Sequence, residues 1–135
     1  MTLIKTIYLG NLRTEAEHLD SGSKLITSAP KDNNGDGLLF SPTDLFATYL
    51  GSCMLTIIGM TARTYGFSID GTTITTEKIM GTNPRRVVEL RLDIKFPEGM
   101  EYSQKEKTLI INSAKTCPVA NSIDPAIKKV VNFIW

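Results

Sequence analysis

Two cysteines, Cys53 and Cys117, are the strongest candidates for chemistry in this sequence, and it contains no others. A thiolate is a nucleophile, and a second thiol close to it can trap its oxidised form as a disulfide. Cys117 directly precedes Pro118, and proline favours the first position of a helix. Cys117 would then occupy the N-cap, where backbone N–H groups and the helix dipole lower the pKa of a thiol. These features make Cys53 and Cys117 the candidates for thiol chemistry, and the indication from local sequence is clearer for Cys117.

A structural interpretation of Cys53 stays open at this point. Its neighbours at helical spacing are apolar or aromatic, and a cysteine among them can be a small buried side chain. The residue types alone do not bring the two sulfurs together. A disulfide reductase is a weaker alternative, because the sequence has no C-x-x-C pair.

Composition indicates an ordinary globular protein. Of its 135 residues, 41% are hydrophobic and 21% charged, which predicts one domain spanning residues 1–135. A chain of this length needs neither a disulfide nor a metal to fold. The net charge of +1, without a long charged run, gives no sign of a nucleic-acid partner.

Several other classes of site are excluded or disfavoured. The single histidine, His18, rules out any motif that needs two, and we interpret it as a surface residue of a strand. We expect no metal and no organic cofactor. The first residues lack the pattern of a secretory signal, so a cytoplasmic location is expected.

One stretch is long enough to be tested as a membrane span. Residues 45–62 carry no charge over 18 positions, close to the length that crosses a bilayer. The stretch also contains threonines, a serine and two glycines. We favour a helix buried on nearly all sides within a domain or dimer, with no membrane partner.

The pattern of elements is βββ–α–ββ–α–β, an α+β chain. A Gly- and Asn-rich loop at 30–41 precedes the long helix. Ser41 is the expected N-cap and Pro42 the first helical residue. The helix runs to Tyr65, and Gly66 is expected to end it. The predicted strands are 3–9, 11–18, 24–28, 72–80, 85–96 and the C-terminal KVVNFIW; a second helix covers 103–116 with a capping box, and a short helical turn follows Cys117.

Three stretches of the chain resemble the OsmC/Ohr family of osmotically inducible and organic hydroperoxide resistance proteins. They are the N-terminal strands leading to the Gly-rich loop, SPTDLFATYLGSC at 41–53 and KTCPVANSI at 115–123. The order of elements is similar too. The resemblance implies an OsmC-like fold with antiparallel sheets around a long buried central helix, in an intertwined homodimer.

The resemblance also implies a mechanism. Cys53 would attack an organic hydroperoxide as a thiolate and become a sulfenic acid. Cys117 would condense with it to a disulfide, which an external dithiol would reduce. This chemistry requires a cation beside the thiolate, and a resolving thiol that prevents over-oxidation. The expected function is a cysteine-based peroxidase in oxidative stress defence.

The activating cation is assigned to Arg13, which lies where the organic-hydroperoxide branch of the family keeps its arginine. An exposed strand arginine is the alternative for this residue. Arg63 shares a helix with Cys53, but ten residues separate them, about 15 Å along the axis, which is too far for contact.

The chain departs from the family pattern after Pro42. The family usually has a glutamate there that pairs with the arginine, and this chain has Thr43, with its acid one residue later at Asp44. Asp44 can be a solvated acid of the first helical turn. This departure supports an alternative function, an OsmC-like protein that binds a small apolar ligand without turnover.

A homodimer is also expected on physical grounds. The long helix is apolar on nearly every side, and a chain this short has little material to cover it. An exposed apolar surface of that size marks an interaction surface. The dimer would give Arg13 a route to Cys53 across the interface.

Overall fold

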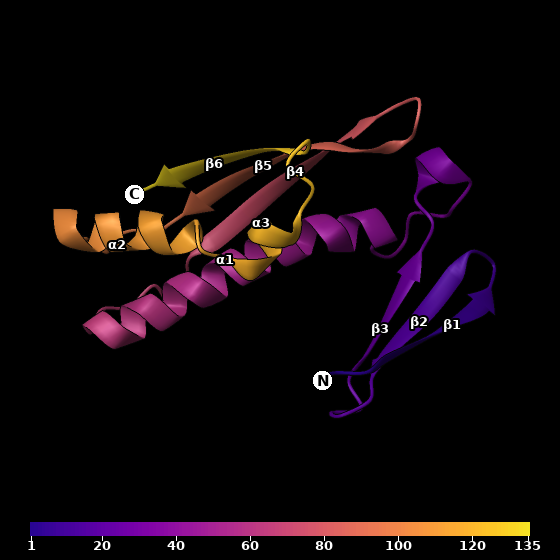
Figure 1. Ribbon diagram of the computed structural model, residues 1–135, viewed down its shortest axis with the longest axis horizontal. Coiled ribbons are helices and arrows are strands. Elements are labelled where there is room, and N and C mark those ends of the chain that lie inside the picture. The colour runs from indigo at the N-terminus through magenta and orange to yellow at the C-terminus, as the bar shows by residue number, and fades with distance from the viewer. The chain divides into compact units, whose positions relative to one another are not determined.

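The computed structural model describes residues 1–135, which form two compact units, Met1–Phe46 and Ala47–Trp135. The elements follow the predicted order, with one addition, a single turn of 3-10 helix, η1, at Lys31–Asn33 (Figure 1). The predicted α+β class and order of elements are confirmed.

The N-terminal unit contains an antiparallel sheet of β1 (Ile4–Gly10), β2 (Arg13–His18) and β3 (Lys24–Ser28). Gly10 pairs with Arg13, so Asn11 and Leu12 form a two-residue hairpin loop. Both have positive φ, 51° and 58°, as a type I′ hairpin turn requires. The tight turn fixes Arg13 as the first residue of β2.

The Gly-rich loop is fastened to β3. The Ser28 amide donates to the Phe40 carbonyl at 3.1 Å, and the Leu39 amide donates to the Ser28 hydroxyl, also at 3.1 Å. Gly35 lies so close to Ala29 that a side chain would overlap its carbonyl. The loop therefore holds a defined conformation around Asp36.

Helix α1 (Pro42–Tyr65) begins and ends where the sequence predicts. The Asp44 amide donates to the Ser41 hydroxyl at 3.1 Å, and the Ser41 amide donates to the Asp44 carboxylate at 2.8 Å. This reciprocal pair is a capping box. Gly66, with φ of 78°, ends the helix.

The C-terminal unit contains the second sheet, in the order β4-β5-β6: β4 (Thr73–Gly81), β5 (Arg86–Lys95) and β6 (Lys128–Ile134). β4 and β5 are antiparallel, but β6 runs parallel to β5. The prediction of purely antiparallel sheets is wrong here. Helices α2 (Gln104–Ala114) and α3 (Pro118–Ser122) form a crossover connection, which lets the chain return in the same direction.

The core of this unit lies between the sheet and its helices, which cover one face of it (Figure 1). Alternate residues of β5 are fully buried, namely Leu90, Leu92 and Ile94. They pack with a cluster that includes Ile58 of α1 and Ile110 of α2. The expected alternation fails only at the start of β5, where a bulge buries Val87 in place of Val88.

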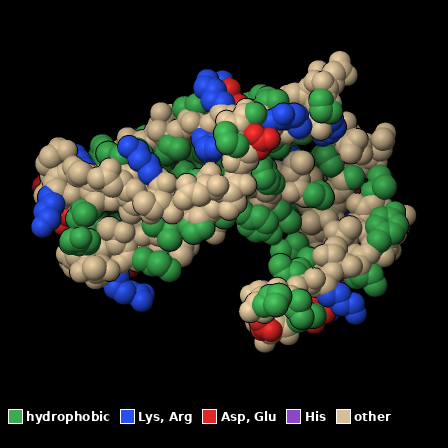
Figure 2. Space-filling model, viewed as in Figure 1, with side chains coloured by type: hydrophobic (Ala, Val, Ile, Leu, Met, Phe, Trp, Pro, Cys, Tyr) green, Lys and Arg blue, Asp and Glu red, His purple; other side chains and the backbone are tan.

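Much apolar surface remains exposed. α1 buries one stripe of six residues, and by length and composition it could cross a membrane, although 33% of its most apolar window is buried. Within a single chain, burial on nearly all sides is therefore not observed. Ile4 and Tyr8 of β1 are 67% and 63% exposed, and hydrophobic side chains are visible at the surface in Figure 2.

Candidate functional site

Cys53 lies in the middle of α1 and is half-buried. The buried stripe of the helix includes Leu50 and Met54, which fix the helix against the C-terminal unit and so fix the direction of the Cys53 side chain. Partial exposure leaves its sulfur accessible to a small molecule. A nucleophile requires that access.

Cys117 is fully buried and occupies the N-cap of α3, as predicted. Its Sγ accepts a hydrogen bond from the Ala120 amide at 3.4 Å. Pro118 begins the short helix, and the Cys117 carbonyl accepts from the Asn121 amide at 3.2 Å. These bonds hold the thiol in one position at the junction of α2 and α3.

The two thiols lie close enough for Cys53 to affect the ionisation of Cys117, and both are free rather than joined in a disulfide. Residues 64 positions apart in the sequence (117 minus 53) are thus brought together inside the C-terminal unit. The expectation that the two sulfurs lie close together is confirmed. Such a pair can carry a dithiol–disulfide exchange without an additional cysteine.

Burial raises the pKa of the Cys117 thiol, and the neighbouring Cys53 side chain raises it further. The amides of Ala120 and Val119 act in the opposite direction, but they do not overcome burial. The N-cap position was therefore correctly expected to lower the pKa of Cys117 through the backbone amides, but the expected net direction was wrong because the pKa is raised. At neutral pH Cys117 remains a protonated thiol, able to donate a hydrogen bond to a thiolate at Cys53.

A small pocket of about 180 Å³ in the C-terminal unit has apolar walls from Met54, Ala114 and Phe133, and Lys115 and Lys129 also line it. Met54 directly follows Cys53 in the sequence, although neither cysteine lines the pocket. The pocket combines an apolar surface with positive charge. Such a surface suits a molecule with a hydrocarbon body.

Arg13, in the N-terminal unit, forms an ion pair with Asp36 of the Gly-rich loop, with 2.8 Å between guanidinium nitrogen and carboxylate oxygen. The Leu38 amide, which donates to Asp36 at 3.0 Å, lowers the pKa of Asp36, and the hydrogen bond from Arg13 adds to this effect, giving a pKa of about 2. The role of Arg13 beside Cys53 stays a prediction.

Sequence reasoning missed Asp36. Its only local signal was its place between two glycines in the loop. The structure also gives Asp44 a definite role, because its carboxylate forms the capping box of α1. The carboxylate found on Arg13 is therefore Asp36. His18, as expected, lies on a strand, where its Nδ1 and the Ser21 hydroxyl are 2.7 Å apart.

Comparison with solved structures supports the same fold. A protein from Psychrobacter arcticus, described as a candidate osmotic stress induced and detoxification response protein, is 50% identical to this chain. The match covers 98% of this chain and 96% of that one, with a TM-score of 0.92. No match was found among curated proteins.

More distant structures share the fold alone. An organic hydroperoxide resistance protein OsmC from Legionella pneumophila is 20% identical, with a TM-score of 0.78, and covers 100% of this chain and 97% of its own. An organic hydroperoxide resistance protein from Elizabethkingia anophelis is 17% identical, with a TM-score of 0.75 and coverage of 99% and 96%. The model of the family described as OsmC-like protein matches residues 35–131, a segment that contains both cysteines. The chain belongs to the OsmC-like family.

Proposed function

We propose that this protein is a thiol-dependent peroxidase that reduces organic hydroperoxides, with Cys53 as the attacking and Cys117 as the resolving residue. The observation that carries the proposal is the pairing of a half-buried thiol with a fully buried one that lies close to it. The raised pKa of Cys117 supports the assignment, because a protonated buried thiol is a poor first nucleophile.

The proposed cycle has three steps. The Cys53 thiolate attacks one oxygen of the hydroperoxide; the O–O bond breaks, the alcohol leaves with a proton, and Cys53 becomes a sulfenic acid. The Cys117 sulfur then attacks the Cys53 sulfur, which releases water and forms the disulfide. An external dithiol supplies two electrons and two protons, restores both thiols and leaves as its own disulfide.

The apolar pocket that Met54, Ala114 and Phe133 line supports a substrate with a hydrocarbon body. The hydroperoxide resistance proteins of similar fold support the same substrate class. Arg13 is proposed as the cation that stabilises the Cys53 thiolate, because opposite charge favours the ionised form of a thiol. Asp36 is proposed to hold the guanidinium, in place of the glutamate that the family has where this chain has Thr43.

The direct test is to treat the reduced protein with one equivalent of cumene hydroperoxide. Free thiols are then titrated, and mass spectrometry is used to look for a bond between Cys53 and Cys117. Loss of both thiols with formation of that disulfide is the expected result. Persistence of both thiols would overturn the proposal and favour the ligand-binding alternative, for which the same apolar pocket is the supporting observation.

Replacing Asp36 by Asn is expected to slow the reaction of Cys53 with peroxide only about fivefold, since an ion pair between exposed side chains contributes little. With a folded pKa of about 2, below its unfolded value, Asp36 stays ionised throughout the neutral range and loses its charge only as the pH falls toward 2. Stopped-flow measurements should therefore give the same rate ratio between the unsubstituted and Asp36→Asn proteins throughout the range from about pH 5 to about pH 8. Proteins are usually most stable in roughly this range.

The matched control for that measurement is Glu15→Gln. Glu15 pairs with Lys24 at 2.9 Å on the same sheet as Arg13, so its removal also breaks an ion pair of the N-terminal unit. This variant should react at the normal rate. An Asp36→Asn protein as fast as the unsubstituted protein would show that Asp36 does not position Arg13.

We further propose an obligate homodimer in the cytoplasm, where dithiol reductants keep protein thiols reduced. Support comes from the exposed apolar residues of β1 and from the exposed side chain of Tyr49 on α1. Dilution should unfold the chain together with dissociation, as measured by sedimentation and circular dichroism. A folded monomer at low micromolar concentration would contradict this assembly.

A further inference from the structure

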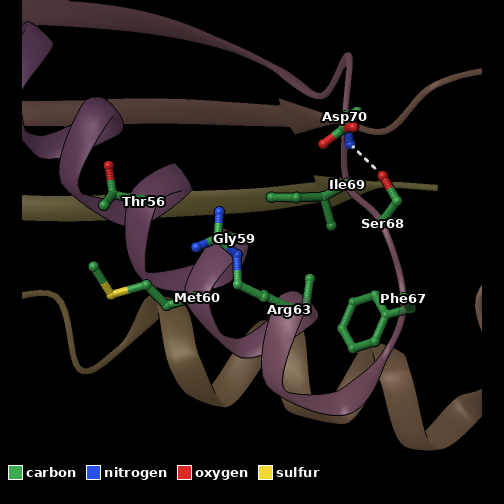
Figure 3. Close-up of a pocket in the computed structure, with 9 residues that line it drawn as sticks. Thr56, Gly59, Met60, Arg63, Phe67, Ser68, Ile69 and Asp70 are labelled. Atoms are coloured by element: carbon green, nitrogen blue, oxygen red, sulfur yellow. Dashed lines mark hydrogen bonds between the residues drawn. The ribbon is translucent and has the colours of Figure 1, made fainter.

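A second and larger pocket, of about 560 Å³, lies within the C-terminal unit between the last turns of α1 and the segment at 67–70 (Figure 3). Its apolar lining comes from Met60, Phe67 and Ile69. Gly59 keeps part of it open, since a Cβ there would have only Ile69 Cδ1 as a neighbour, at 4.0 Å. The volume is in the range that holds a small organic molecule. Neither cysteine lines it, so the proposed peroxidase does not account for it.

Two opposite charges share this pocket. Arg63 reaches back along the helix toward Gly59, and Asp70 lies across the pocket above Ile69 (Figure 3). The two groups form no ion pair with each other, and the Arg63 guanidinium has no acidic partner elsewhere in the chain. The Asp70 amide donates to the Ser68 hydroxyl at 3.0 Å, which fixes the backbone that carries the carboxylate.

We propose that this pocket binds a small zwitterion with an apolar body, of the amino-acid class. The ligand carboxylate would pair with Arg63, whose planar guanidinium matches a carboxylate with two parallel hydrogen bonds. The ligand ammonium would pair with Asp70, and the apolar body would contact Phe67 and Ile69. Asp70 would repel a simple anion and Arg63 a simple cation, so a ligand that carries both charges complements the pocket best.

L-Phenylalanine is the probe, followed through the backbone amide signals of the reduced full-length protein by NMR. Saturable shifts confined to residues 59–70 are expected. Two analogues supply the charge controls: 3-phenylpropanoate lacks the ammonium group and 2-phenylethylamine lacks the carboxylate. Each should bind about tenfold more weakly, because each loses one of the two charge-assisted contacts, with Arg63 or with Asp70.

Substitutions in the pocket separate charge recognition from simple apolar adsorption. Arg63→Gln and Asp70→Asn should each weaken L-phenylalanine binding about tenfold. Asp70→Asn should also reduce the difference in affinity between L-phenylalanine and 3-phenylpropanoate, because the ammonium group loses its partner. Gly59→Ala fits without a clash and should weaken binding by narrowing the pocket. Arg91→Gln, on β5, should bind normally.

Equal binding of all three compounds would overturn the proposal, and so would the absence of saturable shifts at millimolar concentrations. Binding that survives Arg63→Gln and Asp70→Asn unchanged would also overturn it. The measurement involves no peroxide and can be repeated with Cys53→Ser protein. Its outcome is therefore independent of the proposed peroxidase.

Discussion

Replacing Cys53 by Ser is expected to reduce peroxide consumption by about three orders of magnitude or more, because the attacking thiolate is removed. Serine is close to cysteine in size, and Cys53 is half-buried, so the helix should keep its packing on Leu50 and Met54. Consumption of cumene hydroperoxide in the presence of a dithiol measures the effect. Thermal unfolding of the variant shows that the loss is chemical rather than structural.

The companion variant for this measurement is the double substitution of Cys53 and Cys117 by Ser. It should behave as the single Cys53→Ser protein does, since nothing remains for Cys117 to resolve. Residual turnover at the normal rate in the single variant would mean that Cys117 attacks peroxide itself. That result would contradict its complete burial and its raised pKa as the basis for assigning the roles.

Cys117→Ser protein is expected to complete a single turnover with peroxide and then stop cycling. Its Cys53 would form a sulfenic acid as usual, but no thiol would be present to condense with it. Further peroxide would convert Cys53 to sulfinic and sulfonic acids, which the dithiol does not reduce. Mass spectrometry of the variant after successive equivalents of peroxide should show these products accumulate.

Continued turnover of Cys117→Ser protein would be the contradicting outcome. It would mean that the external dithiol reacts directly with the Cys53 sulfenic acid, so that the second cysteine is not required. The proximity of the two thiols would then have a structural role only. Comparing the variant at low and high dithiol concentration distinguishes these two routes.

Local features of this fold could be predicted from the sequence. Ser41 and Pro42 mark the start of α1, and Ser103 with Glu106 forms a complete capping box on α2. These signals depend on residues three or four positions apart, whose geometry a helix fixes by itself. The alternation of Leu90 and Leu92 with polar residues likewise follows from strand geometry alone.

Features that depend on distant residues were predicted less well. The parallel pairing of β6 with β5 depends on the path of the chain through α2 and α3, and the burial of Val87 depends on a bulge between two strands. The partner of Arg13 is Asp36, 23 residues away in a loop without periodicity. Nothing in the local pattern of either residue indicated the pairing.

The pKa of Cys117 shows the same division in one residue. Its N-cap position was evident from Pro118, and the Ala120 amide does lower the pKa of the thiol. Its complete burial, and the contact with Cys53, come from packing between elements far apart in the sequence. The tertiary contributions are the larger, so local reasoning gave the wrong net direction.

The Cys117 sulfur caps α3 in the reduced protein, where it accepts a hydrogen bond from the Ala120 amide at 3.4 Å. If disulfide formation turns that sulfur away from the amide, the cap stabilises the dithiol state over the disulfide. A cap of about 1 kcal/mol would then raise the reduction potential of the pair by roughly 20 mV, and a weaker cellular reductant would regenerate it.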